Sequence, residues 1–384
     1  MSKSNSQKPE TIAARLSGFT DAGSGGVVPP MQPSTTFVRD EDYNLVYPEN
    51  SYGRDNNDQV RLAEKIICQL EGGEDSLLFG SGMAAISVLF SSLKRGEKLI
   101  VQSGIYWGTT AHIRSFCEHR EITLIEADAS DTDALTQLVS REEPAMVFVE
   151  TPSNPWIKVC DVAALAVATK QASSFLAVDA TAATPVLMQP LAMGADVVVH
   201  SATKAINGHS DVLAGVLTCS DTSSRVWQHV TRERHGAGAI LSAQAAWLLI
   251  RGMRTLPLRM ARMCENALEI ARFLDGHEKV SEVWYPGLET HNGHSLAKRQ
   301  MHGGFGYLMS FLVRGGKEEA LAFCRHLHGI HRATSLGGTE SLVEHRHTIE
   351  GDLTGCPENL IRLSVGIENL EDLKSELDDA LSKT

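Results

Sequence analysis

The stretch Asp196-Val-Val-Val-His-Ser-Ala-Thr-Lys-Ala205 joins a run of valines to a turn that carries two hydroxyls and one lysine. A continuous apolar run of this length predicts a strand that is buried on both faces, as in a parallel sheet. Polar side chains that follow such a strand lie beyond its carboxyl end, where open α/β sheets bind their ligands. The stretch therefore predicts both a fold class and the position of a site.

Further apolar runs precede and follow this strand, and they alternate with segments of helical spacing. The expected strands are Ser76–Phe79, Lys98–Gln102, Thr123–Glu126, Ala145–Glu150, Phe175–Asp179, Asp196–His200 and Ala214–Thr218. The expected helices are Gln59–Leu70, Gly82–Leu93, Gly108–Glu118, Asp131–Leu138 and Asp161–Lys170. This alternation is typical of βαβ units, so we expect an α/β fold with a mainly parallel, seven-stranded sheet between helices.

The chain of 384 residues is long enough for two or three domains. Residues 1–50 are rich in Gly, Pro, Asn and Ser and predict an irregular N-terminal arm, which precedes a sheet domain over 51–240. We expect a smaller α+β domain over 241–384. Its expected elements are a long helical stretch interrupted near Pro257 (Ser242–Leu274), the strands Tyr307–Val313 and Ile361–Val365, and the helices Glu318–Leu327 and Asn369–Ser382.

The composition excludes several classes of protein. Lys and Arg number 35 against 47 Asp and Glu, for a net charge of −12, which argues against nucleic-acid binding because phosphate contacts need clustered basic residues. No apolar run approaches the roughly 18 residues of a membrane span, and the polar start lacks a signal peptide's apolar core. The seven cysteines are scattered without CxxC pairs. We therefore expect free thiols, no metal site and a cytoplasmic location.

Residues that could bind a ligand or take part in a reaction follow the ends of several expected strands. Gly80-Ser-Gly-Met-Ala-Ala85 opens a helix with small residues, which leaves backbone N–H groups available for a phosphate. Glu150-Thr-Pro-Ser-Asn-Pro155 is a rigid polar turn, and Asp179 places a carboxylate at a strand end. Because parallel strands end at the same edge of a sheet, these groups are expected to converge with Ser201-Ala-Thr-Lys204 in one crevice.

Pyridoxal phosphate is the cofactor that needs this combination. It requires a lysine for a Schiff base, an acid against its pyridinium nitrogen, and donors for its phosphate. Lys204 and Asp179 supply the first two, and the segment 80–85 with Ser201 and Thr203 supplies the donors. A cofactor-free α/β protein that uses the crevice for binding is the alternative, and the colour of the purified protein separates the two.

The same segments carry a resemblance to a known family. The matching motifs are Asp196–Gly215, Ser81-Gly-Met-Ala-Ala85, Glu150–Pro155, Val178-Asp179, Arg251-Gly-Met-Arg-Thr-Leu256, Ser335-Leu-Gly-Gly338, Glu340-Ser-Leu342 and Arg362-Leu-Ser-Val-Gly-Ile-Glu368. From about Tyr52 to the C-terminus the chain resembles the Cys/Met-metabolism family of pyridoxal-phosphate enzymes, which includes cystathionine γ-synthases, cystathionine γ- and β-lyases, methionine γ-lyases and homoserine sulfhydrylases. The resemblance implies a fold-type-I transferase fold, with pyridoxal phosphate bound by the domain over 51–240.

The resemblance also implies a role for each matched residue. Lys204 would form the Schiff base and then transfer protons, and Tyr106 would stack on the cofactor ring and assist the leaving group. The residues implied to bind the cofactor are Tyr52, Arg54, Gly82, Met83, Tyr106, Asp179, Thr181, Ser201, Thr203 and Lys204. Asn154, Ser335 and Arg362 would bind the substrate, with Arg362 holding its α-carboxylate.

In this family a tyrosine and an arginine from a neighbouring subunit complete the phosphate site, and Tyr52 and Arg54 match them. The resemblance therefore implies a homo-oligomer, a tetramer built from two dimers that share their active sites. The arm over residues 1–50 is expected to contact a neighbouring subunit.

The resemblance favours γ-replacement or γ-elimination on cystathionine or an O-activated homoserine. Cystathionine β-lyase, or another C–S lyase of the family, is the alternative, and an aminotransferase of the same fold is a weaker one. Gly108 stands where methionine γ-lyases carry a cysteine, and Thr334 stands where γ-enzymes often carry a glutamate. The segment Glu344-His-Arg-His347 departs from the usual pattern, and we hypothesise that it forms a basic rim that attracts a substrate carboxylate.

Overall fold

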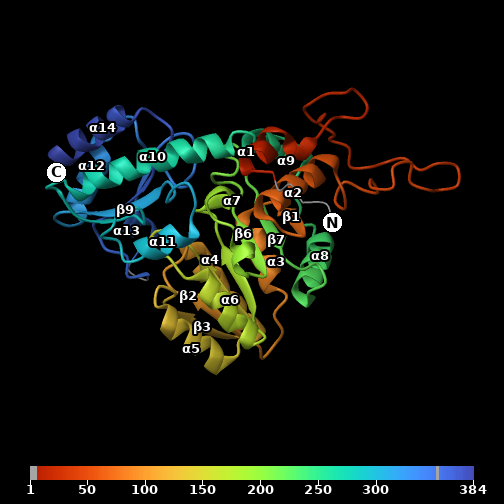
Figure 1. Ribbon diagram of the computed structural model, residues 1–384, viewed down its shortest axis with the longest axis horizontal. Coiled ribbons are helices and arrows are strands. Elements are labelled where there is room, and N and C mark those ends of the chain that lie inside the picture. Colours follow the sequence, from red (N-terminus) through yellow and green to blue (C-terminus); the bar gives the residue numbers. More distant parts are fainter. Residues whose placement is uncertain (1–6, 352–353) are drawn as a thin grey trace.

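The computed structural model describes residues 7–351 and 354–384 and contains the expected large sheet (Figure 1). The seven strands lie in the order β1-β7-β6-β5-β4-β2-β3. Neighbours from β3 to β6 are parallel, whereas β7 is antiparallel to both β6 and β1. The bounds are β1 (Asp75–Phe79), β2 (Lys98–Gln102), β3 (Thr123–Ala127), β4 (Met146–Glu150), β5 (Phe175–Asp179), β6 (Val197–His200) and β7 (Gly215–Cys219). The expected mainly parallel sheet is confirmed, and each strand end is within one residue of its prediction.

Helices cover both faces of this sheet. They are α2 (Asp58–Glu71), α3 (Gly82–Phe90), α4 (Trp107–Arg120), α5 (Thr132–Glu142), α6 (Val162–Gln171), α7 (Thr184–Leu187) and α8 (Arg225–Ala237). Alternate residues of one strand enter different cores: Val147 and Val149 of β4 pack on one side, and Met146 and Phe148 on the other. Burial on both faces explains why the central strands, such as β4, are continuous apolar runs in the sequence.

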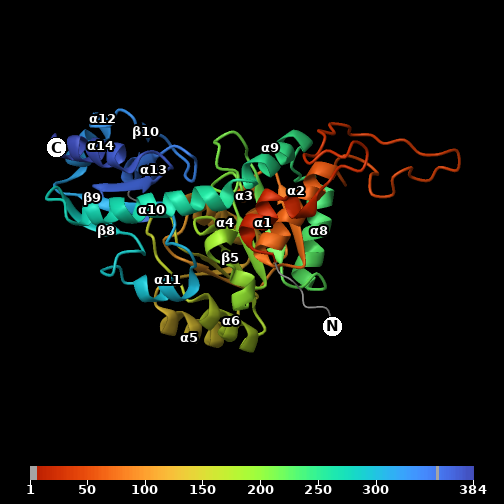
Figure 2. The same ribbon diagram turned by 45° about the horizontal axis from the view of Figure 1, so that its top comes forward.

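A second, smaller sheet forms the C-terminal part of the molecule. Its strands are β8 (Val280–Trp284), β9 (Leu308–Val313), β10 (His331–Arg332), β11 (Leu342–His345) and β12 (Leu360–Ser364), in the order β10-β11-β12-β9-β8. Its helices are α11 (His294–Gln300), α12 (Lys317–His326), α13 (Arg346–Glu350) and α14 (Leu370–Ser382). The long helix α10 (Leu256–Asp275) extends from beside α1 to the second sheet, where it packs on β8 and β9 (Figures 1 and 2).

The start of the described chain is more ordered than the composition predicts. Helix α1 (Pro9–Ala14) and the 3-10 turn η1 (Leu16–Gly18) pack against α2, with Ile12 and Leu16 buried at helical spacing. The segment that follows extends away from the body as loops with exposed apolar side chains (Figures 1 and 2). Helix α9 (Ala243–Met253), at the start of the expected smaller domain, packs on α2. The domain limits at 50/51 and 240/241 stay predictions.

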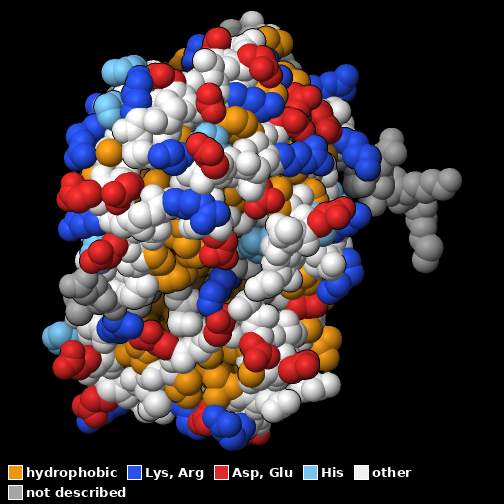
Figure 3. Space-filling view, turned by 90° about the vertical axis from the view of Figure 1, so that its left-hand side faces the viewer, with side chains coloured by type: hydrophobic (Ala, Val, Ile, Leu, Met, Phe, Trp, Pro, Cys, Tyr) orange, Lys and Arg blue, Asp and Glu red, His pale blue; other side chains and the backbone are white. Residues whose placement is uncertain are grey.

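Within residues 7–351 and 354–384, no helix combines the length and apolar character needed to cross a membrane. On the face that the C-terminal part presents in Figure 3, Lys and Arg side chains are interspersed with Asp and Glu side chains.

Candidate active site

A cavity of about 470 Å³ lies at the carboxyl ends of β4, β5 and β6, and the C-terminal sheet closes it from the other side. This is the crevice position expected for an open parallel sheet. All the predicted site residues except Tyr52 and Arg54 line it: Gly82, Met83, Tyr106, Asn154, Asp179, Thr181, Ser201, Thr203, Lys204, Ser335 and Arg362.

Lys204 lies in the turn after β6 and reaches across to the C-terminal part of the chain. Its Nζ donates to Ser335 Oγ at 2.9 Å. Burial, with a smaller contribution from the nearby charge of Arg362, lowers the pKa of this amine to about 8. The neutral form of Lys204, which a nucleophile or general base requires, is therefore more populated near neutral pH than in an ordinary lysine.

Asp179 ends β5, and Glu150 ends the neighbouring strand β4, so the sheet register places the two opposite each other. Burial raises the pKa of Asp179, while hydrogen bonds from Thr181 oppose that shift. Burial and the charge of Asp179 raise the pKa of Glu150 to about 8. Glu150 accepts from the backbone N–H groups of Tyr106 and Asn154, at 3.1 and 2.6 Å. It lines the cavity, although the sequence motifs predict no role for it.

The loop between β1 and α3 has the features of an anion site. Ser81 caps the helix by accepting from Ala84 N at 3.1 Å, and the first N–H groups of a helix have no partner within it. Gly82 lies so close to the turn after β6 that an added Cβ would be 2.9 Å from Ser201 Cβ. The Thr203 hydroxyl donates to Ala214 O and accepts from Ala214 N, contacts that hold the turn. Thr203 also lines the cavity, and its contact with a phosphate stays a prediction.

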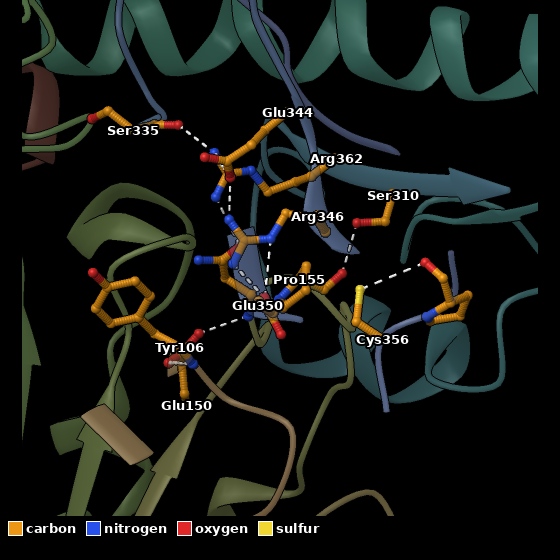
Figure 4. Close-up of polar contacts among 12 residues, drawn as sticks. Tyr106, Glu150, Pro155, Ser310, Ser335, Glu344, Arg346, Glu350, Cys356 and Arg362 are labelled. Atoms are coloured by element: carbon orange, nitrogen blue, oxygen red, sulfur yellow. Dashed lines mark hydrogen bonds and ion pairs between the residues drawn. The ribbon is translucent and has the colours of Figure 1, made fainter. Parts of the chain in front are cut away.

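Arg362 on β12 is buried at the cavity wall (Figure 4). Its Nη1 donates to Asn154 Oδ1 at 3.2 Å, and its Nη2 donates to Ser335 O at 2.7 Å. Among the described residues, its buried Nε has no hydrogen-bond partner. Burial lowers the pKa of Arg362 to about 10, although the adjacent Glu344 opposes this. A guanidinium on the wall of a cavity is suited to bind a carboxylate.

Tyr106 lies at the start of α4, at the open side of the cavity, with 36% of its surface exposed. Its ring lies over Gly108, where an added Cβ would come within 2.6 Å of a ring carbon. Tyr52 and Arg54 do not line the cavity of their own chain. They are exposed, and the Arg54 guanidinium lies 5.5 Å from the centre of the Tyr52 ring.

The hypothesis of a basic rim at Glu344–His347 is wrong. Arg346 is only 2% exposed and forms ion pairs with Glu344 and Glu350, so its charge is neutralised inside the protein. His345 is also buried, and its Nε2 lies 2.6 Å from Glu358 O. Ion pairs and backbone contacts bury the segment, so its arginine and histidines do not form an exposed basic rim. Arg346 does line the cavity, from its wall.

Comparisons with known proteins identify the family. The family model for Cys/Met metabolism PLP-dependent enzymes matches residues 10–382. The chain belongs to this family. It is therefore a fold-type-I, pyridoxal-phosphate-dependent enzyme of sulfur amino-acid metabolism, as expected from the motifs around Lys204.

Several relatives and solved structures are similar over nearly the whole chain. The chain is 38% identical to a cystathionine beta-lyase of Lactococcus lactis, covering 95% of this chain and 96% of the relative. It is 37% identical to a cystathionine gamma-synthase of Mycobacterium tuberculosis, covering 97% and 96%. A cystathionine gamma synthase of Xanthomonas oryzae, solved in complex with cystathionine, superposes with a TM-score of 0.92, 36% identity and 98% coverage of both chains.

Proposed function

We propose that the enzyme catalyses γ-replacement or γ-elimination on cystathionine or an O-activated homoserine. The observation that carries this proposal is the convergence of Lys204, Asp179 and Arg362 on one cavity, contributed by two separate sheets. An amine, an acid and a carboxylate receptor together fit a cofactor-dependent reaction on an amino acid.

The residues present fit pyridoxal phosphate. The buried carboxylate of Asp179 suits a pyridinium nitrogen, and the start of α3 with the Ser201 hydroxyl suits a phosphate. Gly82 supports this fit, because its missing side chain lets the helix start approach Ser201 closely. When bound, the cofactor supplies an electron sink that stabilises negative charge on the substrate carbon.

The protein's own residues would move the protons. The Lys204 amine, with its pKa lowered to about 8, is suited to take a proton from the substrate Cα and later from Cβ. Tyr106 is proposed to assist a leaving group, which its position at the cavity mouth supports. A γ-substituent leaves after deprotonation at both carbons, whereas a β-substituent needs only the first, so the same residues serve either reaction.

Arg362 is proposed to hold the substrate α-carboxylate, with Asn154 and Ser335 keeping its guanidinium in place. The position of Arg362 on the cavity wall and its hydrogen bonds to Asn154 Oδ1 and Ser335 O support this assignment. Ser335 also accepts from Lys204, so it links the carboxylate receptor to the reactive amine.

β-Elimination on cystathionine is the second candidate, because relatives named cystathionine beta-lyase match as well as those named cystathionine gamma-synthase. A substrate panel of cystathionine, O-acylhomoserines with cysteine, homocysteine, methionine and cysteine separates the reactions. We expect 2-oxobutanoate or a new thioether, and pyruvate as the main product would favour the β-lyase.

The cofactor's attachment is tested independently of substrate. We expect the purified protein to absorb visible light after incubation with pyridoxal phosphate, and Lys204→Ala to lose both this absorption and turnover. Wild-type protein that stays colourless with added cofactor would contradict the assignment.

We also propose a cytoplasmic homo-oligomer, a tetramer of site-sharing dimers. The cysteines of the described chain are free thiols, which fits a reducing compartment. Exposed apolar residues in the arm, including Val38, Tyr43 and Tyr47, and the position of Tyr52 and Arg54 outside their own cavity support contact with a second subunit. An active monomer in gel filtration would exclude this.

A further inference from the structure

Arg362 is the first member of a row of four buried charged side chains (Figure 4). Its partner Glu344 lies directly opposite on β11, and Glu344 Oε2 is 3.0 Å from Arg362 Nη2. The same oxygen pairs with Nη1 of Arg346. Arg346 in turn donates from Nε to Glu350 Oε1 at 3.0 Å, and its Nη2 pairs with that same oxygen. Two guanidinium groups thus alternate with two carboxylates, and the row is electrically balanced.

The row is buried, which makes its charges interact strongly. Arg362, Glu344 and Arg346 are 3%, 6% and 2% exposed, and each lines the cavity. At such sites the low local dielectric strengthens both attraction and repulsion. A substrate carboxylate that binds Arg362 therefore meets the negative charge of Glu344 at close range.

Two buried polar atoms in the row have no hydrogen-bond partner in the part of the chain that the structure describes. They are Arg362 Nε and Glu344 Oε1. Buried polar groups are nearly always satisfied, so these two atoms mark incomplete pairing within the row. The unused oxygen of Glu344 shows that Arg362 and Arg346 do not saturate this carboxylate.

We propose that Glu344 competes with the substrate α-carboxylate for Arg362, and that Arg346, anchored by Glu350, weakens this competition by sharing the charge of Glu344. The inference rests on the proposed role of Arg362 as carboxylate receptor. Glu344 and Arg346 are positioning residues, since they act through Arg362. Together they set the affinity of the site for the carboxylate that every amino-acid substrate carries.

The proposal predicts opposite effects for two neighbouring substitutions. Glu344→Gln removes the competing charge, so the affinity for an amino-acid carboxylate rises about tenfold. Arg346→Met removes the residue that shares the charge of Glu344, so the affinity falls about tenfold. A purely structural ion-pair row would weaken binding in both variants.

The test uses the holoenzyme and L-norvaline, an amino acid that lacks a leaving group. Its dissociation constant is read from the change in the visible spectrum on binding. L-Norvalinamide, which has the same amine and side chain without the carboxylate, is the matched control ligand. We expect the dissociation constant of norvaline to fall in Glu344→Gln and to rise in Arg346→Met. That of norvalinamide should change by less than about twofold in both variants.

Control variants complete the experiment. Arg346→Lys keeps the positive charge and is expected to recover part of the lost affinity, and it replaces Arg346→Met if that variant does not fold. Glu358→Gln makes the same chemical change at an exposed position of the C-terminal part. It should leave the dissociation constants of both ligands unchanged. With a turnover substrate, the KM should change in the two opposite directions while kcat stays close to wild type.

Two results would overturn the inference. One is weaker norvaline binding in both Glu344→Gln and Arg346→Met, and the other is an equal change in the dissociation constants of norvaline and norvalinamide. The proposed function fails differently. If Arg362→Met leaves the preference for norvaline over norvalinamide intact, Arg362 is not the carboxylate receptor. A product other than those of γ-chemistry changes the reaction assignment and leaves the norvaline result valid.

Discussion

Glu150 and Asp179 face each other at the ends of β4 and β5, yet only one of them is suited to remain charged. Burial raises the pKa of both carboxyls, and each disfavours the ionised form of the other. Thr181 donates its backbone N–H to Asp179, and the positive ring of the cofactor would favour that charge further. We therefore assign the ionised state to Asp179 and the neutral state to Glu150 near pH 7.

This assignment predicts a pH dependence of stability. The pKa of Glu150 is raised from 4.5 to about 8 in the folded protein, so the unfolded chain binds fewer protons in this interval. The contribution of Glu150 to the free energy of unfolding therefore falls as the pH rises from 4.5 to 8. Glu150→Gln should make the thermal midpoint less dependent on pH across this range.

The quantity to compare is the slope of the thermal midpoint against pH, because Glu150→Gln also loses one accepted backbone hydrogen bond at every pH. That loss lowers the midpoint by a constant amount. Glu118→Gln, an exposed change on α4, is the control and should reproduce the wild-type slope. Equal slopes for wild type and Glu150→Gln would mean that Glu150 is ionised throughout.

At the scale of elements, the start of α3 depends on a glycine. An added Cβ at Gly82 would lie 2.9 Å from Ser201 Cβ, which is closer than side chains normally pack. Gly82→Ala should therefore separate the helix start from the turn after β6 and raise the cofactor's dissociation constant about tenfold, equivalent to ~1.4 kcal/mol. Equilibrium titration of the apoenzyme with pyridoxal phosphate, followed by absorbance, measures this.

Gly236 provides the matched control for the same change. It lies in α8, and an added Cβ there meets no atom within 4 Å. Gly236→Ala should leave cofactor affinity unchanged and favour the helix slightly. Equal affinity in Gly82→Ala and Gly236→Ala would show that the close approach at Gly82 is not needed for the cofactor.

The elements that the sequence predicts well are those whose burial is apolar. The strands β4, β5 and β6 are buried, largely apolar runs, and every strand of the large sheet lies within one residue of its prediction, although β3 contains no buried residue. Helix α8 was missed because Arg234, which pairs with Glu64, occupies a buried position on its inner face. Strand β11 and helix α13 were missed because Glu344 and Arg346 are buried by pairing with each other. Apolar periodicity carries no signal for segments that ion pairs bury.

At the scale of the whole molecule, the cavity joins residues that are far apart in the chain. The motifs at 80–85, 150–155 and 196–205 predicted the half of the site on the large sheet, because strand ends of one parallel sheet converge. The half on the C-terminal sheet, with Ser335 and Arg362, followed only from the family resemblance. No spacing rule places a β12 residue against the turn after β6, since that contact depends on how the two sheets pack.

Tyr52 and Arg54 lie outside the cavity of their own chain, and we propose that they complete the site of a second subunit. The prediction is a complementation between two inactive variants. A chain with Arg54→Ala keeps its Lys204, and a chain with Lys204→Ala keeps its Arg54. In a mixed dimer, the site that retains Lys204 receives Arg54 from the other chain and is intact.

Random mixing places half of the dimers in the mixed form, each with one intact site of two, so co-expression should restore about a quarter of the wild-type activity. Each variant expressed alone should have far less. If Arg54 acted within its own chain, no mixed dimer would contain an intact site, and activity would stay at the level of the separate variants. Recovery of activity would therefore show that each active site is built from two chains.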